Sequence, residues 1–209
     1  MTDEHGSSLK TLQDIRSIME RSARFISLSG WSGIWAGATA LAGSYIAHTW
    51  LEATPGYVAY ETAVPRFIML AFAVLIIAFI GAWYFTWRKT SRQGGTVWNS
   101  ASKRMLAQIT LPMLAGAIFA FKFLFDEQVS YVAPTCLAFY GLALINGSKY
   151  TLSDIKYLGL LEVALGCICL FIPGYGLLFW AIGFGALHVL YGIIMWNKYD
   201  KPISREELS

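Results

Sequence analysis

Charged residues are scarce in this chain of 209 residues, which excludes an ordinary water-soluble domain. Only 14% of the residues are charged, whereas soluble domains carry about 25%. Hydrophobic residues make up 56% of the chain, and no loop is long enough to hold a second domain with its own core. The composition therefore predicts a membrane protein, but it does not identify what the protein binds, transports or converts.

Motifs that carry catalysis or hold cofactors are also missing. The sequence has no HExxH, no Ser-His-Asp set at a supporting spacing and no glycine-rich phosphate loop. The three cysteines, Cys136, Cys167 and Cys169, show no metal or redox spacing. Basic residues are not interleaved with aromatics as in a nucleic-acid surface. We therefore expect no enzymatic activity, no cofactor, no bound metal and no nucleic-acid partner.

The chain does contain six apolar runs that could each cross a hydrocarbon core of about 30 Å as a helix. They lie at roughly 25–50, 65–87, 105–125, 131–149, 154–172 and 175–196. An amphipathic pattern precedes the first run. The first 24 residues of the chain lack the apolar core of a signal peptide. The prediction is an all-α membrane protein of three helical hairpins. Its parts are a cytoplasmic tail with an amphipathic helix at 1–24, a six-helix transmembrane domain at 25–196 and a cytoplasmic tail at 197–209.

Basic residues are distributed unevenly between the two ends of these runs. Fourteen of the sixteen fall on one side, and only Arg66 and Lys122 fall on the other. The positive-inside rule then predicts that both termini are cytoplasmic. The loop between the second and third runs has two readings, as a topology determinant or as a site for anionic lipid head groups. Its basic residues are Arg88, Lys89, Arg92, Lys103 and Arg104.

Glycines recur in the apolar runs at helical spacing, and they favour close helix packing. Gly33 and Gly37 form a GxxxG pattern. Runs one, three and five can be aligned on Gly37, Gly116 and Gly166, which suggests three tandem hairpins, although chance similarity is a rival explanation. The predicted packing positions are Gly33, Gly37, Gly116, Gly159, Gly166, Gly185 and Gly192.

The last two runs also resemble a known two-span repeat. The shared residues are Leu158-Gly159, Leu165-Gly166, Pro173, Gly183 and Tyr191-Gly192-Ile193. This segment resembles the short repeat of the acid-resistance type of six-span bacterial membrane proteins, over about one fifth of the chain. The whole chain looks more like uncharacterised six-span bacterial inner-membrane proteins. That resemblance implies a fold and a location in the bacterial inner membrane, but no activity.

Two ionisable residues, Glu162 and His188, lie well inside the last two apolar runs. Such residues usually face the interior of a helix bundle. Each lies about two turns from the cytoplasmic end of its run, so we expect the two side chains to point inward and to lie within one water of each other. Tyr140 and Asn146 of the fourth run are further candidate partners.

Two functions fit this pair of residues. In the first, the pair is structural, and the protein is a non-catalytic membrane module that partners itself or another inner-membrane protein. In the second, Glu162 and His188 carry protons in a small proton-linked transporter or channel. The two differ in one observable. A transporter needs a polar cavity from one surface to Glu162, and a structural contact needs dry packing there.

Overall fold

Helices are the only regular elements in the part of the chain that the computed structural model describes, residues 28–53 and 60–201. The amphipathic helix predicted within residues 1–24 lies outside these ranges. The helices are α2 (Gly30–Ala53), α3 (Tyr60–Arg92), α4 (Ser100–Phe125), α5 (Val132–Gly147), α6 (Ile155–Leu170), α7 (Gly176–Trp180) and α8 (His188–Met195). A π-helical segment, Ala181–Leu187, joins α7 to α8, and a second one, Trp196–Asp200, follows α8. These four segments form one continuous last helix.

Four of the helices within the described ranges are long and apolar enough to cross a membrane. They are Val64–Arg92, Ser100–Phe125, Val129–Tyr150 and Gly176–Asp200. The other two predicted spans fall short for different reasons. α2 has 24 residues, but its many glycines and its serines and tryptophans lower its hydropathy. α6 has only 16 residues, which at about 1.5 Å per residue do not cover a core of about 30 Å. A membrane protein with transmembrane helices is therefore supported, and six spans are not shown.

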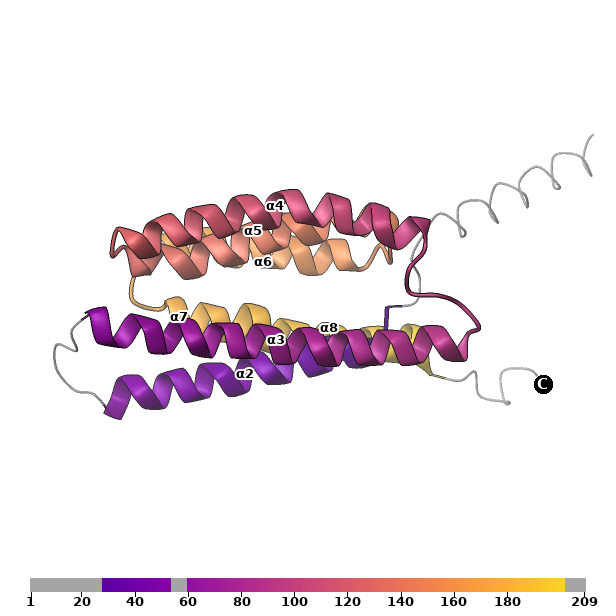
Figure 1. Cartoon of the computed structure of the whole chain (residues 1–209), viewed down its shortest axis with the longest axis horizontal. Helices are drawn as coiled ribbons and strands as arrows, with labels where there is room; N and C mark the ends of the chain where they lie inside the picture. The colour runs from indigo at the N-terminus through magenta and orange to yellow at the C-terminus, as the bar shows by residue number, and fades with distance from the viewer. Residues whose placement is uncertain (1–27, 54–59, 202–209) are drawn as a thin grey trace, which may run out of the picture.

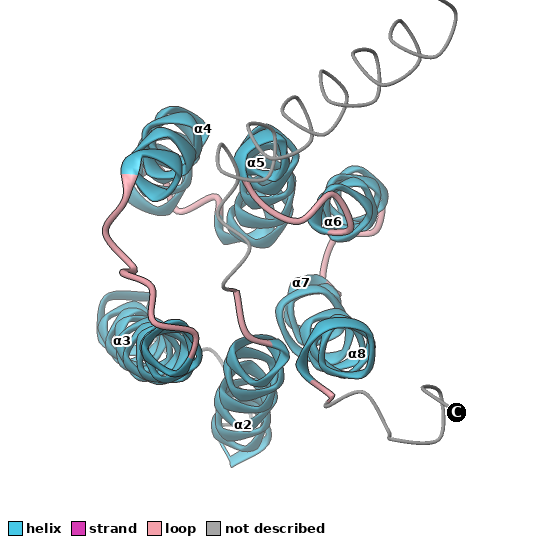
Figure 2. Cartoon of the chain, turned by 90° about the vertical axis from the view of Figure 1, so that its right-hand side faces the viewer, coloured by secondary structure: helices cyan, strands magenta, loops and turns pink. Residues whose placement is uncertain are grey.

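The helices are arranged as two layers of three. Figure 2 shows α4, α5 and α6 side by side in one layer, facing α3, α2 and the last helix in the other. Figure 1 shows the same division from the side, with the start of α2 and the end of the last helix at one end of the molecule. Of the three hairpins expected from the sequence, α2–α3 and α4–α5 pack closely.

The third expected hairpin, α6 with the last helix, is not a closely packed pair. α6 packs mainly against α5, and the last helix packs mainly against α2. The physical reason lies in the glycines, because a helix packs most closely where both backbones lack side chains. Gly159 and Gly166 of α6 meet α5, whereas Gly185 and Gly192 of the last helix meet α2. The tandem repeat of three equivalent hairpins is not confirmed.

α2 and the last helix approach backbone to backbone. A Cβ atom added at Gly37 would lie 2.6 Å from the carbonyl oxygen of Gly185, and one added at Gly33 would lie 3.1 Å from the Cα of Gly192. α5 and α6 make an equivalent contact, because a Cβ added at Gly141 would lie 2.5 Å from the carbonyl oxygen of Gly159. Each layer is therefore held together by helix faces on which a side chain at Gly37 or Gly141 would collide with the backbone of the neighbouring helix.

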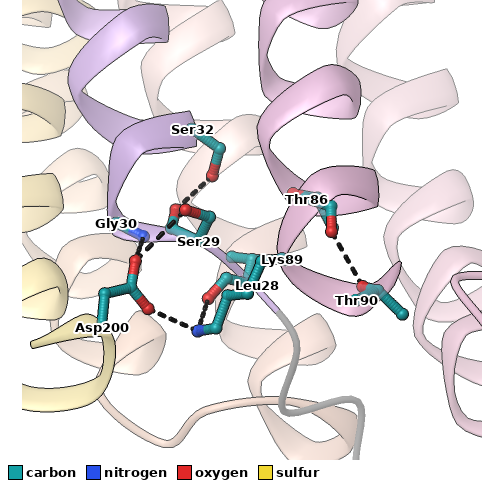
Figure 3. A network of polar contacts seen from close by, with 8 residues as sticks. All are labelled: Leu28, Ser29, Gly30, Ser32, Thr86, Lys89, Thr90 and Asp200. Atoms are coloured by element: carbon teal, nitrogen blue, oxygen red, sulfur yellow. Dashed lines mark hydrogen bonds and ion pairs between the residues drawn. The ribbon is translucent and has the colours of Figure 1, made fainter. Parts of the chain in front are cut away.

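The end of the last helix is tied to α3 by a buried ion pair and to the start of α2 by a hydrogen bond (Figure 3). The carboxylate of Asp200 lies 2.6 Å from Lys89 Nζ, with the two side chains 10% and 14% exposed. Asp200 Oδ2 also accepts a hydrogen bond of 2.9 Å from the backbone N–H of Gly30, the first residue of α2. An acidic group at a helix N-terminus satisfies a free N–H and interacts favourably with the helix dipole. Asp200 therefore joins the last helix, α2 and α3 at one end of their layer.

Candidate functional site

Glu162 has an entirely buried side chain, 0% exposed, on the face of α6 that carries Gly159 and Gly166. Its nearest ionisable neighbour is His188, whose Nδ1 lies 3.5 Å from Glu162 Oε1. The structure thus brings together the two residues that helical spacing placed at matched depth. Neither carboxyl oxygen has a hydrogen-bond partner of ordinary length among the described residues.

His188 has both ring nitrogens in hydrogen bonds. Nδ1 lies 3.0 Å from the carbonyl oxygen of Gly183, which can only accept, so the proton is on Nδ1. In the neutral imidazole, Nε2 then accepts a hydrogen bond of 2.7 Å from the hydroxyl of Tyr140. The side chain of His188 is only 9% exposed. We call the group formed by Tyr140, Glu162, Gly183 and His188 the polar clasp, because it joins α5 and α6 of one layer to the last helix of the other.

The π-helical segment determines how His188 meets Gly183. The two residues are five apart, a spacing at which an α-helix does not place a side chain next to a carbonyl but a π-helical turn does. Gly183 also makes room for the carboxyl group, because a Cβ added there would lie 2.6 Å from Glu162 Oε2. Reasoning from α-helical spacing missed Gly183. The glycine five residues before the buried histidine was the available signal.

Aromatic rings surround the histidine on the side of the last helix. Phe184 lies with its ring centre 5.1 Å from that of Tyr140 and 6.1 Å from that of His188. Trp180 packs on Phe184 in turn, at 4.5 Å between ring centres. These rings keep the polar clasp in a low-dielectric environment, where hydrogen bonds are strong and an unpartnered polar group is costly.

A cavity of about 350 Å³ lies between the two layers and reaches Tyr140 and His188, but not Glu162. Most of the residues that line it are apolar, from α2, α3, α4, α5 and the last helix. A second cavity, of about 620 Å³, lies at the end of α3 beside the Lys89–Asp200 pair. The described residues hold no group of three or more His, Cys, Asp or Glu side chains that could bind a metal ion.

The other residues singled out in the sequence take different places. Asn146 lies six residues beyond Tyr140 on α5 and makes no hydrogen bond to the clasp within the described part of the chain. Gly116 packs against Phe139 of α5. Of the basic residues expected at a lipid site, Lys89 is paired with Asp200, and the ammonium of Lys103 lies over the ring of Trp98 at 5.6 Å. The aspartate partner of Lys89 comes from the predicted tail, because the last helix extends to Asp200.

Comparison of the chain with models of protein families, with curated proteins and with solved structures finds no match. The resemblance of residues 158–193 to a two-span repeat therefore stays a prediction. The chain is identified at the level that its structure supports, as a helical protein with four long apolar helices that could span a membrane.

Proposed function

We propose that this protein is a non-catalytic integral membrane module in which the polar clasp is structural, and that it works through contacts with a second copy or another membrane protein. The observation that carries the proposal is the complete burial of Glu162. Its side chain is 0% exposed, and neither of the two cavities described above includes it among its lining residues. A group that exchanges protons with water during transport needs an aqueous path.

The proton-linked alternative has one observation in its favour. Tyr140, His188 and Glu162 lie next to one another, with His188 in the middle. Hydrogen-bonded titratable groups in a membrane can relay protons. Two features weigh against this function. The cavity that reaches Tyr140 and His188 is lined mainly by apolar residues, and the His188 Nδ1 proton is directed to the Gly183 carbonyl rather than being free for transfer to Glu162.

Proton flux in liposomes separates the two functions. The protein is reconstituted with a pH-sensitive dye inside the vesicles, and an imposed pH gradient is followed with a potassium ionophore present to prevent charge build-up. We expect the wild-type protein and Glu162→Gln to leak protons no faster than empty vesicles. Flux through the wild-type protein that Glu162→Gln abolishes, with Ser44→Ala as a folded control, would overturn the structural function in favour of transport.

Anionic lipid is the partner best supported at the end of α3. The cavity of about 620 Å³ is lined by Arg88 and Arg92 together with the aromatic rings of Trp31 and Trp196. Guanidinium groups bind phosphate through paired N–H donors, and tryptophan favours the membrane interface. Because Asp200 already neutralises Lys89, the two arginines are the cations that supply this site with charge.

Retention of anionic lipid by the purified protein tests this partner. Arg88→Gln with Arg92→Gln should lower the amount of phosphatidylglycerol retained from mixed micelles, relative to zwitterionic lipid. The matched control is Lys103→Gln with Arg104→Gln, which removes the same charge from the neighbouring helix. An equal loss in both double variants would show a diffuse charge effect and no site at Arg88 and Arg92.

A further inference from the structure

The cavity between the two layers opens where α3 and α4 part. α3 packs against α2 and α4 packs against α5, whereas α3 and α4 are not among the closely packed pairs of described helices. Figure 2 shows the two helices standing apart at one edge of the molecule. Their side chains form opposite walls of the cavity, with Phe72 and Leu75 on α3 and Met113 and Ala117 on α4. These walls belong to two of the candidate membrane spans, so the opening faces the hydrocarbon of the bilayer.

The polar groups in the inner wall of this cavity already have hydrogen-bond partners within the protein. Tyr140 and His188 reach it, but the hydroxyl of Tyr140 is bonded to Nε2, and Nδ1 is bonded to the Gly183 carbonyl. A polar solute would exchange its bonds to water for a wall that is mainly apolar and whose donors are already used, which is unfavourable. An apolar chain loses nothing there, and its burial against the wall gains dispersion contacts.

The size of the cavity excludes a helix of another protein as occupant. A helix about 10 Å wide has a cross-section of about 80 Å², so less than one turn of about 5.4 Å would fill the volume. The cavity measures about 350 Å³, close to the lower bound for small-molecule sites. Such sites span about 300–1,000 Å³. An unbranched hydrocarbon chain is much narrower than a helix, so it suits a cavity of this volume.

We propose that this cavity is a lipid-binding site that takes one acyl chain of a bilayer lipid between α3 and α4, with the chain end against Phe139 and Tyr140. Small residues keep the site open, because Ala40, Ala78 and Gly116 line it where larger side chains would fill it. The site goes beyond the structural function proposed for the clasp and does not depend on it. The acyl chain fills the space between α3 and α4.

Photocrosslinking in nanodiscs tests the site. The full chain is reconstituted with a phospholipid that carries a diazirine near the end of one acyl chain, and in parallel with a free fatty acid carrying the same group. After irradiation, adducts are mapped by mass spectrometry. We expect adducts at Cys136 and Phe139 inside the cavity, besides those at Ile118 and Phe121, which are 69% and 70% exposed on α4. The probe that labels the cavity shows whether the chain comes from a phospholipid or a free acid.

Ala117→Trp should fill the mouth of the cavity and reduce the inner adducts at least fivefold, while the adducts at Ile118 and Phe121 remain. The matched control is Ala107→Trp, at an exposed position on α4 that does not line the cavity. If Ala117→Trp does not fold, Ala78→Leu fills the opposite wall more gently. Inner adducts that are absent from the wild-type protein, or that persist in the filled variants, would overturn the proposal. So would crosslinks from cavity residues to a second protein chain. None of these results bears on the proton flux that tests the clasp.

Discussion

The carboxyl group of Glu162 is fully buried without a hydrogen-bond partner among the described residues, and His188 Nδ1 lies 3.5 Å from it. In an environment of low dielectric, removing one member of such a contact leaves the other buried without a polar partner, which lowers the stability of the folded protein. Gly183 supports this arrangement twice, because its carbonyl oxygen accepts the hydrogen bond from His188 Nδ1 and its missing side chain leaves space for the carboxyl oxygens.

Gly183→Ala should therefore destabilise the protein by about 1–3 kcal/mol, the usual cost of forcing an extra methyl group into a packed core. The added Cβ would lie 2.6 Å from Glu162 Oε2 and would also collide with Leu137. Gly95→Ala is the control, because its Cβ would lie at an ordinary 3.4 Å from Thr90. Equal melting temperatures of the two variants in detergent would show that Gly183 is not packed tightly against Glu162 and Leu137.

A second residue-scale prediction concerns Asp154, which precedes α6 outside the membrane-spanning segments. Its carboxylate accepts hydrogen bonds from Lys198 Nζ at 2.8 Å and from the Tyr199 hydroxyl at 2.6 Å. The bond from Lys198, followed by that from Tyr199, lowers the pKa of Asp154 below its ordinary value of 3.8. A lowered pKa in the folded protein means that this stabilisation is present above pH 3.8 and is lost as pH falls through the folded value.

Stability measured between pH 7 and pH 3 should show this loss in the wild-type protein. The acid-induced loss should be smaller in Asp154→Asn, which has no carboxyl group to protonate. Because Lys198 is half exposed, the difference should be small and should shrink in high salt. Identical acid-induced losses in both proteins would show that the carboxylate contributes nothing to folding.

At the scale of helices, glycine-lined contacts decide which pairs form. The sequence located every described helix and placed the packing stripe on α2, because apolar length and glycine spacing are local properties. It did not predict that the last helix packs against α2 instead of α6. Both α2 and α6 carry glycines, and only the three-dimensional packing selects between them. The π-helical segments were also missed, since the same local sequence fits an α-helix.

Gly37→Leu should disrupt the contact between α2 and the last helix. Its Cβ would lie 2.6 Å from the Gly185 carbonyl oxygen and 2.7 Å from the Val189 nitrogen, and backbone atoms cannot move aside as side chains can. We expect a loss of stability of about 3 kcal/mol or more. Ala73→Leu makes a comparable enlargement at an exposed position of α3 and should have little effect in detergent. Similar thermal shifts in both variants would show that the glycine stripe faces lipid.

At the scale of the molecule, the described helices form two layers that meet along α5, α6 and the last helix, with α3 and α4 standing apart at one edge. The sequence predicted the membrane class and the pairing of Glu162 with His188, because both follow from apolar runs and residue depth. It did not predict the layers or the cavity, which arise from the choice of helix partners. The side of the membrane on which each loop lies rests on the distribution of basic residues alone.

Single cysteines at Gly94 and Gln128, in a chain whose three native cysteines are replaced by alanine, test the orientation. Gly94 lies between α3 and α4, and Gln128 lies between α4 and α5, so α4 separates the two positions. A membrane-impermeant maleimide should label the cysteine at position 128 in intact cells, and the cysteine at position 94 only after the membrane is permeabilised. The reverse order would show an inverted orientation, and labelling of both in intact cells would contradict a crossing by α4.

The central claim is that the polar clasp joins the two layers, and a double-mutant cycle between Glu162 and His188 tests it most directly. Glu162→Met and His188→Phe remove the polar groups while nearly keeping their volumes, and free energies of unfolding are measured in detergent. Each single variant should destabilise the protein, and the double variant should lose less than the sum, with a coupling of about 0.5–3 kcal/mol. Pairing Glu162→Met with Ser44→Ala, whose hydroxyl bonds within α2, should be additive. Additivity in the Glu162–His188 cycle as well would contradict the account.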